Sequence, residues 1–176
     1  MTTLAIIATT VAVVLVLFLI YAATRPNTFA ISRTASIQAP PDKIQPLIND
    51  FHQWPQWSPY EAKDPGMQRT FSGAASGKGA IYAWDGDKNV GTGRMEILDA
   101  SLAKVAIKLD FIKPFEGHNV AEFSFEPRGE TTTVTWAMHG PVPYIGKIMH
   151  LLINMDRMIG RDFEAGLANL KAVCER

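Results

Sequence analysis

The chain has 176 residues, 47% of them hydrophobic, and its 17 basic residues balance 17 acidic ones at a formal net charge of zero. A neutral chain without a basic run is not expected to bind nucleic acid. Its single cysteine, Cys174, excludes an internal disulfide framework.

The first element is an apolar run from Leu4 to Ala23 that contains no charged side chain. A helix over this run rises about 30 Å, the thickness of the hydrocarbon core of a bilayer. No lysine or arginine precedes the run, and Tyr21 stands where a signal-peptide cleavage site after Ala23 needs a small residue. We therefore expect a retained, single-pass membrane anchor rather than a signal peptide. Because Arg25 and Arg33 follow the run, the positive-inside rule predicts a cytoplasmic location for the remaining chain.

The sequence predicts three regions. Residues 1–25 form the transmembrane anchor, residues 26–28 a linker, and residues 29–176 one domain that is long enough to bury its own core.

The domain begins with a predicted strand, Phe29–Gln38, that ends at a pair of prolines. Pro41 suits the first turn of a helix, and Asp42 suits its positive end. Pro46 limits this helix to a short or kinked one. The aromatic and proline-rich segment 51–60 indicates a second short helix or a rigid loop.

From Met67 onward the hydrophobic period changes to two, which is typical of strands. The turn chemistry of residues 85–89 and the short gaps elsewhere predict antiparallel pairing. One face of these strands is apolar and the other polar, so one face must pack on a core. The predicted strands are Met67–Ser72, Ala80–Asp85, Val90–Leu98, Val105–Ile112, Asn119–Glu126 and Thr132–His139.

The stretch from Tyr144 to Cys174 has the period of one long amphipathic helix. Its apolar stripe needs a partner, and the apolar face of the sheet supplies one. We therefore predict an α+β helix-grip fold, in which a curved antiparallel sheet of about seven strands surrounds the C-terminal helix. The stripe consists of Ile145, Ile148, Leu152, Met155, Ile159, Phe163, Leu167, Leu170 and Cys174.

Within this order of elements the chain has a distinctive set of residues: Trp54, Trp57-Ser58-Pro59-Tyr60, Tyr82, Trp84, Gly91-Thr92-Gly93-Arg94-Met95, Lys113-Pro114-Phe115, Trp136 and Met155 to Lys171. With these residues the chain resembles the START-like helix-grip superfamily, and more narrowly the bacterial polyketide cyclase/dehydrase and lipid-transport group known as SRPBCC. The resemblance covers residues 29–176 and implies a hydrophobic ligand cavity between the sheet and the C-terminal helix. It implies no catalytic motif common to the family, and the N-terminal anchor lies outside it.

Large apolar side chains on the expected inner surfaces are the candidate ligand-binding residues. Aromatic rings beside the expected mouth suit stacking on a flat apolar ligand, although packing of the core explains the same pattern. The candidates are Trp54, Trp57, Tyr60, Tyr82, Trp84, Met95, Leu109, Phe111, Phe123, Trp136, Met155 and Ile159.

The sequence predicts no metal site, no cofactor and no catalytic residue. Residues 85–96 carry ligand types of a calcium loop, but Val90 stands where that loop requires glycine. The four histidines have no zinc-site spacing, and His139 is expected on the outside of the sheet. The acids of the strands fall on the polar face, so no paired-carboxylate site is expected.

These patterns favour a membrane-anchored binding module that holds a small hydrophobic molecule or lipid between the sheet and the C-terminal helix. The first alternative is an enzyme of the polyketide cyclase/dehydrase type, which needs an acid–base group inside the cavity. The second is a structural or regulatory domain whose cavity is filled by its own side chains.

Overall fold

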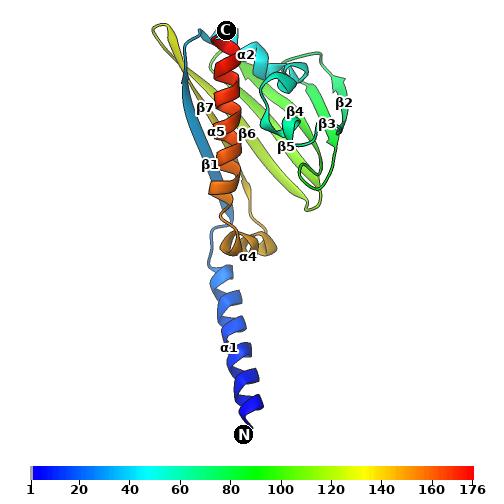
Figure 1. Cartoon of the computed structure of the whole chain (residues 1–176), viewed down its shortest axis with the longest axis vertical. Helices are drawn as coiled ribbons and strands as arrows, with labels where there is room; N and C mark the ends of the chain where they lie inside the picture. The colour runs from blue at the N-terminus through cyan, green and yellow to red at the C-terminus, as the bar shows by residue number, and fades with distance from the viewer. Residues whose placement is uncertain (1) are drawn as a thin grey trace.

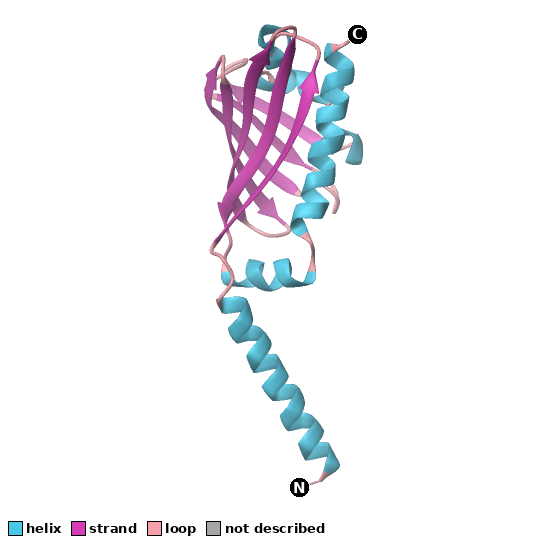
Figure 2. Ribbon diagram, turned by 90° about the vertical axis from the view of Figure 1, so that its left-hand side faces the viewer, coloured by secondary structure: helices cyan, strands magenta, loops and turns pink. Residues whose placement is uncertain are grey.

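The computed structural model describes residues 2–176. An apolar helix is followed by a domain in which a seven-stranded sheet holds a long helix against one face (Figures 1 and 2). The elements in chain order are α1 (Thr3–Ala23), β1 (Thr28–Ile37), α2 (Pro41–Asn49), the 3₁₀-helix η1 (Phe51–Gln56), α3 (Pro59–Lys63), β2 (Gln68–Gly73), β3 (Ala80–Asp85), β4 (Thr92–Ser101), β5 (Lys104–Lys113), β6 (Gly117–Arg128), β7 (Thr131–Pro141), α4 (Tyr144–Leu152) and α5 (Met155–Cys174).

The sheet is antiparallel throughout, with the strand order β1-β7-β6-β5-β4-β3-β2. Thr28 pairs with Pro141 and Val120 with His139, so the starts of β1 and β6 lie beside the end of β7. The turn between Ser101 and Lys104 lies at the opposite end of the sheet. The predicted α+β helix-grip fold, with short helices after the first strand, is confirmed.

The inner face of the sheet follows the predicted alternation. Buried residues of this face include Tyr82, Ile107, Phe123 and Val134. Their polar neighbours along the same strands, such as Lys108 beside Ile107 and Glu122 beside Phe123, are more exposed. His139 is exposed, as expected from its position in the alternation. This buried face forms the main hydrophobic core together with α5.

Helix α5 approaches the sheet closely at Gly166. A Cβ atom on this residue would lie 2.7 Å from the ring of Trp136, so glycine is what allows the contact. One turn away, the ring of Phe163 stacks on Trp136 with centroids 4.1 Å apart and planes 10° from parallel. The helix therefore fills the space above β7 at this level.

A second contact between α5 and the sheet is made by Arg33 on β1. Its guanidinium passes over Gly160, where any Cβ atom would overlap it. On α5 it donates from Nε to Glu164 at 2.7 Å and from a terminal nitrogen to Asp156 at 3.1 Å. Gly160 therefore permits an ion-pair staple that joins the edge strand to two turns of the helix.

The predicted single helix from Tyr144 to Cys174 is wrong in one respect, because the structure divides it into α4 and α5. Ile153 leaves the helical conformation, with φ −124° and ψ 129°. The side-chain oxygen of Asn154 then accepts a hydrogen bond from the backbone N–H of Arg157 at 2.9 Å. Asn154 thus caps a new helix, which changes direction relative to α4 (Figure 1).

Helix α1 leaves most of its apolar side chains exposed. Its length and composition fit both a membrane anchor and a signal sequence. Residues 24–27 connect it to β1, and the backbone N–H of Val142 donates to Asn27 at 2.7 Å. The last turns of α1 also meet α4, because the Tyr144 hydroxyl donates to the carbonyl of Leu19 at 2.8 Å and Lys147 donates to that of Ala23 at 3.3 Å.

Candidate functional site

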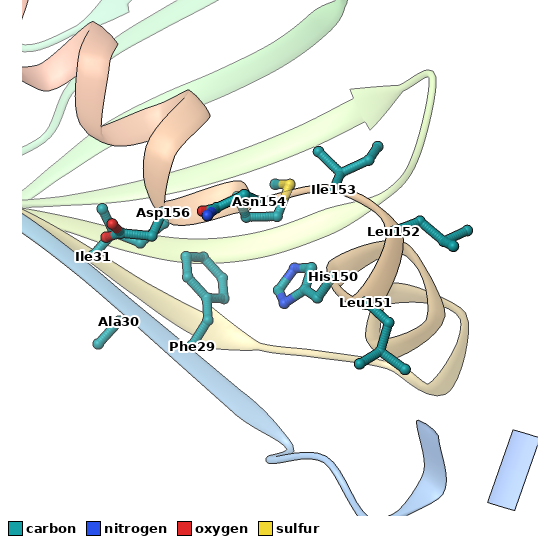
Figure 3. A pocket seen from close by; sticks show the side chains of 10 residues that line it. Phe29, Ala30, Ile31, His150, Leu151, Leu152, Ile153, Asn154 and Asp156 are labelled. Carbon is teal, nitrogen blue, oxygen red and sulfur yellow. The ribbon is translucent and has the colours of Figure 1, made fainter. Parts of the chain in front are cut away.

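A pocket of about 560 Å³ lies at the end of the domain that adjoins α1, between the start of β1 and the α4–α5 junction (Figure 3). The volume falls in the range of ligand sites, about 300–1,000 Å³, and the pocket is a shallow hollow open to solvent rather than an enclosed cavity. The lining residues are Phe29, Ala30 and Ile31 from β1 and His150, Leu151, Leu152, Ile153, Asn154, Met155 and Asp156 from the helices.

The interruption between α4 and α5 creates this pocket. Because Ile153 is extended, α4 turns away from the axis of α5 and leaves a hollow against β1 (Figures 1 and 3). Two short segments that are distant in sequence therefore form its walls. The cap at Asn154 fixes where the wall from the helices ends and α5 begins.

The walls combine apolar side chains with polar groups, in roughly equal exposed surface. Phe29 and His150 face one another edge to face, with ring centroids 6.0 Å apart and planes at 85° (Figure 3). Leu151, Ile153 and Met155 add aliphatic and thioether surface. These side chains give the pocket one apolar side, against which an apolar part of a ligand can pack.

Two polar groups of the wall are already engaged. Asn154 caps α5, and Asp156 is paired with Arg33. The hydrogen bond from Arg33 holds the pKa of Asp156 below its usual value, so this carboxylate stays ionised near neutral pH. Among the described residues, none is hydrogen-bonded to the ring of His150.

The candidate residues predicted from sequence come together, but mostly in the core and not around this pocket. Seven are buried in one cluster: Trp54, Trp57, Tyr82, Trp84, Met95, Phe123 and Trp136. Tyr60, Leu109, Phe111 and Ile159 are half-buried against the same cluster. Of the twelve candidates, Met155 lines the pocket. Ligand contact by the other eleven stays a prediction.

The aromatic members of this cluster pack on one another between the short helices and the sheet. Trp57 meets Phe123 at 5.9 Å and Trp136 at 5.6 Å between ring centroids. Within this packing two buried polar atoms, Ser58 Oγ and Trp136 Nε1, have no hydrogen-bond partner among the described residues. An unpaired N–H in an apolar interior is costly, so the packing around Trp136 leaves a polar group of this region unsatisfied.

Sequence reasoning missed a buried carboxylate, Glu61 on α3. It accepts from Arg69 Nε and from the Tyr82 hydroxyl, each at 2.7 Å. Burial, together with the Glu61 hydrogen bond, raises the pKa of Tyr82 well above its ordinary value. Both oxygens of Glu61 are occupied, so this group holds α3 against β2 and β3 and is not positioned as a free acid or base.

The pocket residues from β1 and the helix junction were also missed, with the exception of Met155. Asn154 followed by Asp156 is a recognised signature of a helix start, and it indicates the junction. The apolar periodicity on both sides of Asn154 obscured that signature.

A curved antiparallel sheet packed against a long C-terminal helix defines a helix-grip domain. The chain belongs to the polyketide cyclase/dehydrase and lipid transport family, whose model matches residues 28–175. This match confirms the resemblance seen in the sequence.

Solved structures support the same fold. A protein from Thermobifida fusca matches with a TM-score of 0.62 at 18% identity, covering 82% of this chain and 92% of that one. A Chromobacterium violaceum protein matches with a TM-score of 0.58 at 14% identity, and the match covers 86% of this chain and 99% of that one. The di-domain ARO/CYC StfQ of the steffimycin biosynthetic pathway matches with a TM-score of 0.61 at 12% identity, and the match covers 84% of this chain and 51% of that one. At these identities the likeness shows the fold alone. A search of curated proteins gives no significant match.

Proposed function

We propose that this protein is a membrane-anchored binding module that holds a small hydrophobic molecule or lipid in the pocket between β1 and the α4–α5 junction. The observation that carries the proposal is the position of this pocket, with its apolar side chains, at the end of the domain that adjoins α1. Apolar ligands partition into the bilayer, so a pocket next to an anchor has its ligand nearby. The twelve residues predicted from sequence belong to the proposal as the inward extension of the site.

The contacts of α1 favour a retained anchor over a cleaved signal. Hydrogen bonds from Tyr144 and Lys147 end on carbonyl groups of its last turns, and Tyr21 and Arg25 beside them are residue types enriched at membrane interfaces. Arg25 and Arg33 on the domain side support a cytoplasmic location.

The test is native mass spectrometry of the full chain purified from membranes in mild detergent, followed by solvent extraction. We expect a co-purifying apolar molecule. Leu151→Asp places a charge in the pocket wall and should lower its occupancy roughly tenfold, the equivalent of about 1.4 kcal/mol. Leu102→Asp, an exposed position at the other end of the sheet, is the matched control and should retain the ligand. A clean unliganded mass, with no uptake from a lipid extract, overturns the proposal.

An enzyme of the cyclase/dehydrase type is the second candidate, and the position of His150 favours it. Its imidazole lies in the pocket wall against Phe29, and no hydrogen bond within residues 2–176 engages it. Incubating the extracted ligand with the protein tests it: an enzyme yields a product that has lost water, and His150→Phe abolishes that product while retaining the ligand. An unchanged ligand mass in both proteins excludes dehydration by His150.

A further inference from the structure

Helix α4 buries its charged side chain and exposes apolar ones, the reverse of a helix on the surface of a water-soluble domain. Its lysine, Lys147, is only 7% exposed, whereas Ile145 and Leu152 are 63% and 69% exposed. A helix packed on a domain in water normally does the reverse, with its apolar stripe on the core and its charge in solvent. The outward face of α4 is therefore built for a partner less polar than water.

The outward face is a continuous apolar stripe. Ile145, Ile148, Met149 and Leu152 follow the spacing i, i+3, i+4, i+7, which places them on one side of the helix. Lys147 and His150 lie on the other side, toward α1 and the pocket. The segment from Gly140 to Met155 contains no acidic residue. Nothing on α4 therefore repels an anionic surface.

The position of α4 identifies what covers the stripe. The helix lies across the end of α1, as Figures 1 and 2 both show, and two hydrogen bonds tie it to the last turns of α1. A helix that lies in the plane of a membrane surface has this orientation relative to a helix that spans the membrane. The Tyr144 hydroxyl reaches Leu19, two residues from Tyr21, and membrane proteins concentrate tyrosine at the interface.

We propose that α4 is an interfacial helix whose Ile145–Leu152 stripe is inserted in the leaflet from which α1 emerges. This inference rests on the proposed membrane anchor and adds the surface that docks on the bilayer. Leu151, Leu152 and Ile153 belong both to the pocket wall and to this end of α4. The pocket therefore opens at the level of the lipid headgroups, and an acyl chain or similar apolar molecule enters it from the leaflet without crossing water.

The test uses the full chain in phosphatidylcholine vesicles with single environment-sensitive fluorophores. The labelled variants are Leu152→Cys on α4, Val13→Cys in the middle of α1 and Leu102→Cys in the β4–β5 turn. Leu102 is 76% exposed and of the same residue type as Leu152, which makes it the matched control. Native Cys174 is 1% exposed, and wild-type protein serves as the blank for labelling.

Brominated lipids then report the depth of each probe. We expect quenching at position 13 by bromines deep in the acyl chains, quenching at position 152 by bromines near the headgroups, and none at position 102. If position 13 is quenched and position 152 behaves like position 102, the anchor stands and the interfacial helix is overturned. If position 13 is not quenched, the anchor itself fails. A probe at position 152 that is shielded from water but not quenched by any lipid means that protein covers the stripe, which also overturns the proposal.

Discussion

At the residue scale, Trp84 shows why an inner aromatic residue is hard to assign from sequence. Its ring is stacked beside Tyr82 with centroids 6.1 Å apart, and its Nε1 donates to Val90 at 3.0 Å. Gly93 lies directly beneath the ring. These contacts serve packing, whether or not a ligand also reaches the indole.

Trp84→Ala should cost roughly 3–5 kcal/mol of folding free energy, because it leaves a large cavity in the core. Urea denaturation measures this loss. The ligand affinity of the protein that remains folded separates a role in packing from a role in ligand contact. The sequence-based prediction that Trp84 lines the site requires this affinity to fall as well. An unchanged affinity would remove Trp84 from the site.

Asn154 is the other decisive residue, because its side chain starts α5 and ends the pocket wall. Asn154→Ala removes the hydrogen bond to Arg157 and should lower the free energy of unfolding by about 1 kcal/mol, a normal value for a lost helix cap. Chemical denaturation measures it, with Asn154→Ser as a control that keeps a capping oxygen. A variant as stable as wild type would show that the junction does not depend on this cap.

At the scale of elements, the ion-pair staple from β1 to α5 gives the protein a pH-dependent contact. Arg33 lowers the pKa of Asp156, so the pair stabilises the fold above the unfolded pKa of aspartate, near 3.9, and this contribution is lost as the pH falls through the lower folded pKa. Thermal melts of Arg33→Met should show a lower Tm than wild type at pH 7. The difference should shrink below about pH 4. A difference that persists in acid would assign the effect to packing of the Arg33 side chain.

The elements also show what the sequence reveals and what it conceals. Strands such as Ala80–Asp85 are predictable because every second side chain meets the core, and the structure reproduces that strand residue for residue. The helix junction is concealed because Asn154 interrupts an apolar stripe that resumes at Met155. The burial of Lys147 is equally hidden, since periodicity alone assumes that charge faces water. The pocket depends on the helix junction, so its position could not be obtained from the pattern.

At the scale of the whole molecule, α4 is where α1 meets the domain. The domain has its own core, and within the described residues α1 contacts it mainly through α4. We therefore expect residues 24–176 to fold without α1, with a far-ultraviolet circular dichroism spectrum of a folded α+β domain. An unfolded fragment would show that the domain depends on α1.

The same fragment exposes the apolar stripe of α4 to water and should self-associate. Replacing Ile145 and Leu152 with serine should restore a monomer, measured by light scattering during gel filtration. A fragment that is already monomeric would mean that water tolerates the stripe as it is.

The connection between α1 and the sheet has a consequence for transport. Residues 24–27 reach at most about 13 Å when fully extended, and the bond from Val142 to Asn27 shortens that reach further. An anchored domain on so short a tether cannot shuttle cargo through the aqueous phase to a distant membrane. In the anchored form proposed above, exchange of ligand is confined to two dimensions: each molecule loads and unloads only where its own bilayer, or a partner diffusing in it, comes to the mouth of the pocket.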